Sequence, residues 1–355
     1  MPGGTPSLTV DAFLAAGGPL VDVRSPGEFD QGHIPQAINL PLFSDGQRAQ
    51  VGTCYKQQGR QAAVLLGLAL VGPRLQELAQ GLSALAQPGQ PLRLHCWRGG
   101  MRSSSMAWLA SSLELPVVLL DGGYKAFRRW VLASFERPLP LLLLAGRTGT
   151  GKTDLLQALA LRGQAVVDLE GLANHRGSSF GGLGMAPQPS SEHYENLLAA
   201  ALLALQGRSP IWLEAESAQV GRCRIPGALW RQMGEAPVIE IQRSQQERVG
   251  QLVATYGPHG QEALGAATAR IGRRLGPQRS AAALAAIEAS DWAGACAQML
   301  DYYDRCYDHE LSLRQRPLLA SFDLSGLDPA AAAELLISNS NWQPSSAMKG
   351  YRPSS

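Results

Sequence analysis

The most chemically suggestive residue of the sequence is a cysteine surrounded by glycine and arginine. Cys96 follows the alternating run 92–95, and two glycines and a predicted helix come after it. Backbone amides in such a loop converge on one point and, with the dipole of the helix, favour an anion and therefore a thiolate. Arg98 and Arg102 add positive charge and paired donors that suit an oxyanion. The segment predicts a nucleophilic thiolate inside an anion-binding loop, with Cys96, Arg98 and Arg102 as catalytic residues.

The spacing within this loop leaves a second interpretation open. Arg102 lies six residues after Cys96 and is followed by Ser103. This is also the spacing of cysteine-dependent phosphatases, whose loop encloses a tetrahedral oxyanion. A phosphatase needs an aspartate as general acid, and the sequence offers only Asp121 as the nearest downstream candidate. The loop alone does not decide between a phosphatase and another cysteine-dependent transferase.

A second loop, GRTGTGKT at residues 146–153, matches the P-loop pattern in full. It follows the apolar run 139–145 and precedes a predicted helix at 152–161, as the motif requires. The loop amides would surround a β-phosphate, the lysine would neutralise it, and the final threonine could reach Mg²⁺. The predicted phosphate-binding residues are Gly146, Thr148, Gly149, Gly151, Lys152 and Thr153.

The acidic partner of this loop is less evident. No second apolar strand ends in the usual aspartate, but the run 211–213 leads into Glu214 and Glu216, and the run 165–169 contains Asp168. Each of these carboxylates could act on Mg²⁺ through a water molecule. We predict Asp168, Glu214 and Glu216 as candidate partners. A diphosphate ligand that is bound without hydrolysis also stays open.

Both loops need a strand before them and a helix after them, and the flanking sequence supplies these elements. Apolar runs in the first part predict strands at 20–23, 92–95 and 116–120, a short strand within 32–41, and helices at 62–71, 75–86 and 103–112. Such alternation is typical of a parallel sheet covered on both faces.

A second α/β unit begins near residues 135–138. Buried strands are predicted at 139–145, 165–169, 210–213 and 237–241, and the region 245–333 reads as mostly helical. The predicted fold class is therefore α/β. We expect a parallel-sheet domain at 1–135, a P-loop NTPase-like domain with a helical C-terminal part at 136–336, and a flexible tail at 337–355.

The composition is that of a globular protein. Its 355 residues are 45% hydrophobic and 17% charged, which suits two ordinary domains with full cores. The net charge of +2 does not indicate a nucleic-acid partner, and the five scattered cysteines, without a CxxC pair, argue against a zinc site or a disulfide framework. Without an evident signal peptide or an 18-residue apolar stretch, we expect a cytoplasmic protein with no membrane partner and no resident metal.

The first domain resembles a known family. Residues 22–29 (DVRSPGEF) and 32–37 (GHIPQA) resemble the N-terminal signature of rhodanese domains, and 121–123 (DGG) their C-terminal segment. The agreement covers most of residues 8–132 and places Cys96 at the sulfur-carrying cysteine of that family. The resemblance implies a rhodanese-like fold and a cysteine that hands a chalcogen to an acceptor. Rhodaneses usually keep arginine five residues after the cysteine, so the longer loop suits a tetrahedral donor such as selenophosphate.

The whole chain up to about residue 336 resembles the tRNA 2-selenouridine synthase family. The resemblance rests on the two loops and on segments 51–59, 122–128 and 169–181. It implies that the wobble 2-thiouridine in the anticodon loop of tRNA exchanges sulfur for selenium from selenophosphate, after S-geranylation by geranyl diphosphate. The P-loop would then hold geranyl diphosphate, and Cys96 would hold or deliver selenium. Binding of ATP or GTP, covalent selenium on Cys96 and a role for Cys54 stay open.

A tRNA substrate needs basic side chains on the surface. Arg270, Arg273 and Arg274 share one helical face, with Arg279 nearby, and are candidate phosphate contacts. Further candidates are Arg222, Arg224, Arg231, Arg243 and Arg248, and the loop 175–179 is a candidate lining of the active site. The alternative for these arginines is a helix face that only contacts solvent. The alternatives for the whole protein are a sulfurtransferase with an ATP-binding regulatory domain and an ATP-driven RNA-binding module with a vestigial rhodanese domain.

Overall fold

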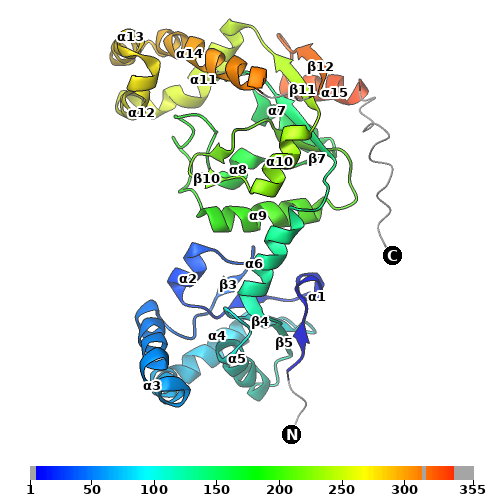
Figure 1. Ribbon diagram of the computed structural model, residues 1–355, viewed down its shortest axis with the longest axis vertical. Coiled ribbons are helices and arrows are strands. Elements are labelled where there is room, and N and C mark those ends of the chain that lie inside the picture. The colour runs from blue at the N-terminus through cyan, green and yellow to red at the C-terminus, as the bar shows by residue number, and fades with distance from the viewer. Residues whose placement is uncertain (1–4, 314–316, 340–355) are drawn as a thin grey trace. The chain divides into compact units, whose positions relative to one another are not determined.

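The computed structural model describes residues 5–313 and 317–339 and divides into two compact units (Figure 1). The first unit contains the chain up to Ser134 together with Glu195–Ala199. The second contains Phe135–Tyr194 and the chain from Ala200 onward. Each unit has its own parallel sheet, which confirms the predicted α/β fold class.

The first unit is a five-stranded sheet in the order β1-β5-β4-β2-β3, in which every pair is parallel. Its strands are β1 (Ser7–Leu8), β2 (Leu20–Asp22), β3 (Ile38–Asn39), β4 (Leu92–His95) and β5 (Val117–Leu120). Its helices are α1 (Val10–Ala15), α2 (Pro26–Gln31), α3 (Asp45–Val71), a 3-10 turn (Gly72–Arg74), α4 (Leu75–Leu85), α5 (Met101–Ser112) and α6 (Gly123–Ser134). Because β4 is the central strand, Cys96 leaves the sheet in the middle of its carboxyl edge.

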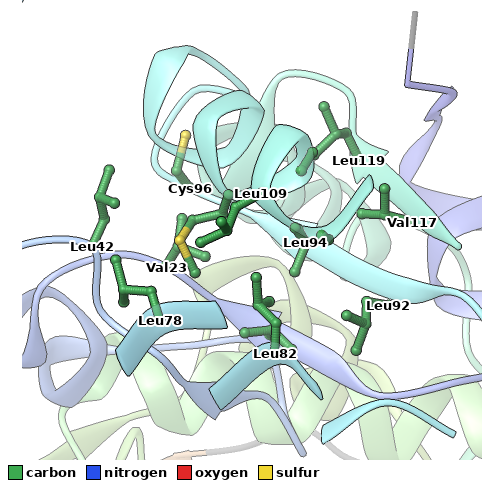
Figure 2. Close-up of a cluster of buried hydrophobic side chains, with 14 of the residues drawn as sticks. Val23, Leu42, Leu78, Leu82, Leu92, Leu94, Cys96, Leu109, Val117 and Leu119 are labelled. Atoms are coloured by element: carbon green, nitrogen blue, oxygen red, sulfur yellow. The ribbon is translucent and has the colours of Figure 1, made fainter. Parts of the chain in front are cut away.

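The core of this unit forms around β4. Leu92 and Leu94 are buried in one cluster with side chains of α4, α5 and β5, and Figure 2 shows Cys96 at the margin of that cluster. The alternation of the strand places Arg93 on the opposite face, where it donates to the carbonyl of Gly18. The apolar strand therefore fixes the position of the cysteine that follows it.

A buried ion pair sits beside the same edge of the sheet. Asp22 and Arg24 are both fully buried, and the guanidinium of Arg24 donates to both carboxylate oxygens at 2.6–3.0 Å. The same guanidinium donates to Gly32 O and lies 3.7 Å from the centre of the Tyr124 ring. The residues Asp22 and Arg24 of the rhodanese signature therefore tie β2 to the following turn and to α6.

The second unit has a five-stranded parallel sheet in the order β12-β11-β6-β8-β7 and a separate antiparallel hairpin. Its strands are β6 (Leu141–Ala145), β7 (Ala165–Val166), β8 (Ile211–Glu214), β11 (Val238–Gln242) and β12 (Leu318–Asp323), with β9 (Gln219–Val220) and β10 (Cys223–Arg224) in the hairpin. Its helices are α7 (Lys152–Leu161), α8 (Leu169–Ala173), α9 (Ser191–Ala204, apart from Glu195–Ala199, which belongs to the first unit), α10 (Gly227–Glu235), α11 (Gln245–Tyr256), a 3-10 turn (Gly257–His259), α12 (Gly260–Leu275), α13 (Pro277–Glu288), α14 (Trp292–Leu313) and α15 (Pro329–Ser338). The P-loop follows β6, which is again the central strand.

Several predicted elements have different bounds. The strand predicted at 165–169 stops at Val166, because Asp168 accepts a hydrogen bond from Gly171 N at 2.7 Å and caps α8. The helix predicted at 62–71 begins at Asp45, after a capping box formed by Ser44. Strand β12 lies in the region predicted as mostly helical, where it pairs with β11.

The predicted flexible tail at 337–355 is only partly tested. Helix α15 continues through Ser338, so the first two residues of that range are helical instead of flexible. Asp328 caps this helix by accepting a hydrogen bond from Ala331 N, and Leu336 is buried in the core of the second unit. Residues 340–355 lie outside the described part of the chain.

One helical stretch, Asp45–Leu85, is long and apolar enough to cross a membrane by length and composition. This differs from the expectation that no such stretch exists, because α3 and α4 together extend the apolar run beyond its predicted bounds. Its most apolar window has a mean hydropathy of 1.4 and is 11% buried. One such helix is weak evidence, since helices of soluble proteins meet the same criteria.

Candidate active sites

Backbone amides in the first turn of α6 donate hydrogen bonds to carbonyls of the Cys96 loop. Tyr124 N donates to Cys96 O at 2.8 Å, and Lys125 N donates to Trp97 O at 2.9 Å. These two bonds engage the loop carbonyls with the helix. A β-carbon on Gly123, which has a φ of 61°, would lie 2.4 Å from Cys96 O. The glycines before Tyr124 therefore allow the close approach that fixes the loop.

Cys96 is only 3% exposed, and its Sγ has two polar neighbours, the hydroxyl of Ser103 and, at 3.8 Å, the carbonyl oxygen of Gly100. Its Sγ lies 3.2 Å from the Oγ of Ser103, and Ser103 Oγ also lies 3.1 Å from Gly100 O. The hydroxyl can turn from the carbonyl to the sulfur and donate to a thiolate. Ser103 was not among the predicted catalytic residues, although its place directly after Arg102 in the loop was a signal.

Arg102 is engaged by a carboxylate in this structure. Its two terminal nitrogens donate to Glu28 at 2.5 and 3.2 Å, and Arg48 also reaches Glu28, at 3.5 Å. Burial acts to raise the pKa of Glu28, but the hydrogen bonds and charge of Arg102 outweigh it, and the pKa is lowered. Glu28 thus orients the guanidinium that an incoming oxyanion would share. The predicted Arg98 is exposed on the loop.

His95, the residue before the cysteine, does not add positive charge to the loop. It is fully buried, and burial lowers its pKa to about 4, although Asp22 lies 3.7 Å from its Nε2. At neutral pH the ring is therefore neutral. The predicted binding of an anion would therefore depend on the loop amides and on the two arginines.

The P-loop has the backbone geometry that its sequence predicts. Gly149 and Gly151 have φ values of 82° and 76°, and a β-carbon on Gly146 would lie 2.8 Å from Ile241 O. Lys152 leads α7, and its Nζ donates to Gly146 O at 2.8 Å. All six predicted phosphate-binding residues lie in this loop or on the first turn of α7.

Two arginines hold the carbonyls of this loop. Arg248 Nε donates to Thr148 O at 2.8 Å, and Arg243 Nε donates to Thr150 O at 3.1 Å. Arg248 is 4% exposed and forms a paired salt bridge with Asp304 at 2.9 and 2.5 Å. The prediction that Arg248 contacts tRNA phosphates is therefore wrong, because its guanidinium is buried and occupied. Arg243 likewise uses one of its hydrogen-bond donors on a carbonyl of the P-loop.

The carboxylate closest to the P-loop threonine is one that we did not predict. Thr153 Oγ1 donates to Glu170 Oε2 at 2.8 Å. Burial, and then the charge of Glu216, raise the pKa of Glu170 to about 7. A β-carbon on Gly177 would lie 2.8 Å from Glu216 Oε2 and 2.9 Å from Glu170 Oε1, so both carboxylates converge there. Glu170, two residues after a predicted candidate, was missed: it lies just beyond the predicted strand 165–169, in the segment 169–181 that served only the family resemblance.

The other two predicted acidic partners have structural roles. Asp168 caps α8, and Glu214 is fully buried and accepts a hydrogen bond from Leu169 N at 3.1 Å. Burial and then the charge of Asp168 raise the pKa of Glu214 well above its usual value. Within the described residues, no group of three or more His, Cys, Asp or Glu side chains could hold a metal alone. The hydroxyl and carboxylate oxygens of Thr153 and Glu170 suit Mg²⁺ that arrives with a phosphate.

An apolar cavity borders the P-loop. With its open mouth counted, it has about 550 Å³ of space free of atoms, of which about 50 Å³ admits the centre of a water molecule, and it shares Thr148 with the loop. Ser178, from the predicted lining loop 175–179, contributes one wall, and its hydroxyl lies 3.3 Å from Tyr256 OH. The remaining walls are mostly hydrocarbon and aromatic: Phe180, Leu252, Val253, Gly257, Leu264, Ile287, Trp292, Ala295, Cys296, Met299, Leu300 and Tyr303.

The predicted arginine face lies partly open to solvent. Arg270, Arg273 and Arg274 are exposed on α12. Arg279 is half-buried and forms an ion pair with Asp301 at 2.5 Å. Three of the four predicted tRNA contacts therefore have the exposure that a phosphate contact needs.

Comparisons with known proteins match both the first and the second part of the chain. A rhodanese-like domain model matches residues 9–129, and a model described as the tRNA 2-selenouridine synthase AAA domain matches residues 139–328. The chain is 38% identical to a tRNA 2-selenouridine synthase of Shewanella denitrificans, over 90% of this chain and 95% of that protein. The chain belongs to the tRNA 2-selenouridine synthase family. A protein of that name from Marinobacter nauticus is 38% identical over 85% of this chain and 90% of its own length.

We expect Ser103→Ala to slow alkylation of Cys96 by iodoacetamide at neutral pH by about tenfold, because a hydrogen bond to a charged group is lost. Peptide mass spectrometry over time measures the rate at this cysteine. Ser104→Ala, at an exposed position of the same helix, is the matched control and should react like the unaltered protein. An unchanged rate in Ser103→Ala would show that the hydroxyl does not stabilise the thiolate.

Proposed function

We propose that the chain is a tRNA-modifying transferase that replaces the sulfur of the wobble 2-thiouridine with selenium. Selenophosphate supplies the selenium, and geranyl diphosphate first alkylates the sulfur so that it can leave. Relatives that carry the name tRNA 2-selenouridine synthase support the overall activity, since one of them matches 90% of this chain. The glycines, thiol and arginines of the Cys96 loop support an active rhodanese-like unit over a vestigial one.

The apolar cavity beside the P-loop is the observation that carries the geranyl part of this proposal. A diphosphate held by the loop would direct the rest of its ligand past Thr148 into that cavity. A nucleobase would leave polar groups unpaired against most of these walls, at roughly 1–3 kcal/mol for each group. A hydrocarbon chain has no such groups. The cavity therefore favours geranyl diphosphate over ATP or GTP.

In the first step the sulfur of 2-thiouridine attacks C1 of the geranyl chain. A carbon–sulfur bond forms, and diphosphate leaves with the electron pair of the broken carbon–oxygen bond. The negative charge that develops lies in the P-loop, where the loop amides and Lys152 stabilise it. Thr153 and Glu170 offer oxygen atoms for Mg²⁺ bound to the leaving group. No water needs activation in this step, which agrees with the missing Walker-type aspartate.

In the second step, the number of electrons on selenium and phosphorus determines which atom the Cys96 thiolate can attack. Selenium in selenophosphate is already at the oxidation level of selenide, so its transfer to a thiolate as a neutral atom would leave the phosphorus reduced. The consistent step is attack of the Cys96 thiolate on phosphorus, with selenide leaving with the electron pair of the phosphorus–selenium bond. Selenide then attacks C2 of the base. The geranylthio group leaves with the carbon–sulfur pair and takes up a proton, and water releases phosphate from the cysteine.

We expect Cys96→Ser to stop formation of 2-selenouridine and to leave S-geranylation intact, because only the second step uses this thiolate. Mass spectrometry of nucleosides from thiolated tRNA, incubated with geranyl diphosphate and with or without selenophosphate, separates the two steps. Cys306→Ser removes an exposed thiol elsewhere and should retain both products. Loss of geranylation in Cys96→Ser would mean that the roles of the two units are wrongly divided.

We expect Cys296→Phe to weaken binding of geranyl diphosphate by at least about tenfold, because the added ring occupies the apolar cavity. Affinity for inorganic diphosphate should stay within about twofold, since the P-loop is untouched. Calorimetric titration measures both ligands, and Cys296→Ser is the volume-matched control. Lys152→Ala should weaken the binding of both ligands, because both use the P-loop. Equal affinity of Cys296→Phe and Cys296→Ser for geranyl diphosphate would show that the geranyl group does not bind in this cavity.

A further inference from the structure

Helix α3 carries segment 51–59, which belongs to the family resemblance but to neither anion loop. An open hollow lies along this helix, and its lining combines three glutamine amides with a threonine hydroxyl and small apolar groups. The lining residues are Ala49, Gln50, Thr53, Cys54, Gln57, Gln58, Ala62 and Leu66. No hydrogen bond between these amides and another described residue occupies their donors and acceptors. The hollow can therefore offer hydrogen bonds in both directions to a planar polar ligand.

A break in the helix shapes this hollow. Gly59 has a φ of 85° and a ψ of −179°, so α3 consists of two helical runs joined at a kink. A β-carbon on Gly59 would meet nothing within 4 Å, so this backbone conformation, not crowding, requires glycine. Gln58 and Ala62 line the hollow from opposite sides of the kink. The kink thus brings residues of both runs to one surface.

The surface around the hollow is aromatic and basic. Tyr55 is 58% exposed, and Lys56 and Arg60 are exposed without an ion pair to any described residue. The acidic residue of α3, Asp45, is occupied at the other end of the helix, where it accepts hydrogen bonds from Gly27 N at 2.9 and 3.1 Å. An exposed aromatic ring beside unpaired cations is an arrangement that suits single-stranded nucleic acid.

The hollow also lies near the catalytic loop. Arg48, on the first turn of α3, reaches Glu28 at 3.5 Å, and Glu28 holds Arg102 of the Cys96 loop. The helical rise of roughly 1.5 Å per residue places Gln50 and Gln57 about 3 and 14 Å further along α3. An RNA strand with one base in the hollow would therefore need only a few further nucleotides to reach the thiol of Cys96.

We propose that this face of α3 binds single-stranded RNA next to the reacting uridine, with one flanking base in the hollow. The glutamine amides meet the edge of that base, Tyr55 stacks on a base, and Lys56 and Arg60 contact phosphates. The inference rests on the proposed function for the identity of the RNA, an anticodon loop. It adds a second basic surface to the arginines of α12, carried by the rhodanese-like unit itself.

The test is the affinity of the full-length protein for a fluorescein-labelled anticodon stem–loop, measured by anisotropy at several salt concentrations. Tyr55→Ala should weaken binding at least about fivefold through lost stacking, and Tyr55→Phe should bind like the unaltered protein. Lys56→Gln should lower the salt slope by about 0.7, as expected for one single-strand phosphate contact. Arg137→Gln, an exposed arginine outside α3, is the charge-matched control and should lower the slope less.

Unchanged affinity in Tyr55→Ala together with an unchanged salt slope in Lys56→Gln would overturn the RNA site on α3. Equally tight binding of a fully double-stranded RNA would also overturn it, because a duplex cannot place a base in the hollow. These outcomes are separate from failure of the proposed function. If the unaltered protein makes no 2-selenouridine but the α3 variants lose RNA affinity, the reaction is wrongly assigned and the RNA site stands.

Discussion

The hydrogen bonds that engage the backbone carbonyls of two loops are the interactions on which both candidate sites depend. In the first unit, Tyr124 N and Lys125 N bind the carbonyls of the Cys96 loop at 2.8 and 2.9 Å. In the second unit, Arg248 and Arg243 bind P-loop carbonyls at 2.8 and 3.1 Å. Because the loop carbonyls already accept these hydrogen bonds, the loop amides are available to bind an anion. The two loops share this principle, but one uses a helix terminus and the other uses side chains.

The two anion sites suit different chemistry. The P-loop carries a lysine and lies beside an apolar cavity, so it can bind a diphosphate whose other end is a hydrocarbon. In the proposed reaction, the P-loop would receive the negative charge of the leaving diphosphate. The Cys96 loop has a buried thiol 3.2 Å from Ser103 and an arginine oriented by Glu28, so it suits attack on a tetrahedral phosphorus. Under the proposed function, this division would explain why one chain needs both units: one would prepare the acceptor and the other would release the selenium.

Elements defined by local patterns were predictable, and those defined by distant partners were not. The strand 92–95 and the helix 152–161 have their predicted bounds, because apolar alternation and a glycine loop fix them locally. The edge strand β12 owes its place to pairing with β11, and Asp168 ends a predicted strand through a side-chain cap. Arg248 looked like a surface arginine because its partner, Asp304, is far away in sequence. In the same way, the Cys96 loop could be predicted, but the role of Glu28 could not, since its contact with the loop is tertiary.

Whether geranylation of sulfur precedes its replacement by selenium can be decided in one time course. The unaltered protein is incubated with thiolated tRNA, geranyl diphosphate and selenophosphate, and nucleosides are quantified by mass spectrometry. We expect S-geranyl-2-thiouridine to rise first and then to fall as 2-selenouridine appears. We also expect that omission of geranyl diphosphate stops both products. Formation of 2-selenouridine at an undiminished rate without geranyl diphosphate would contradict the account.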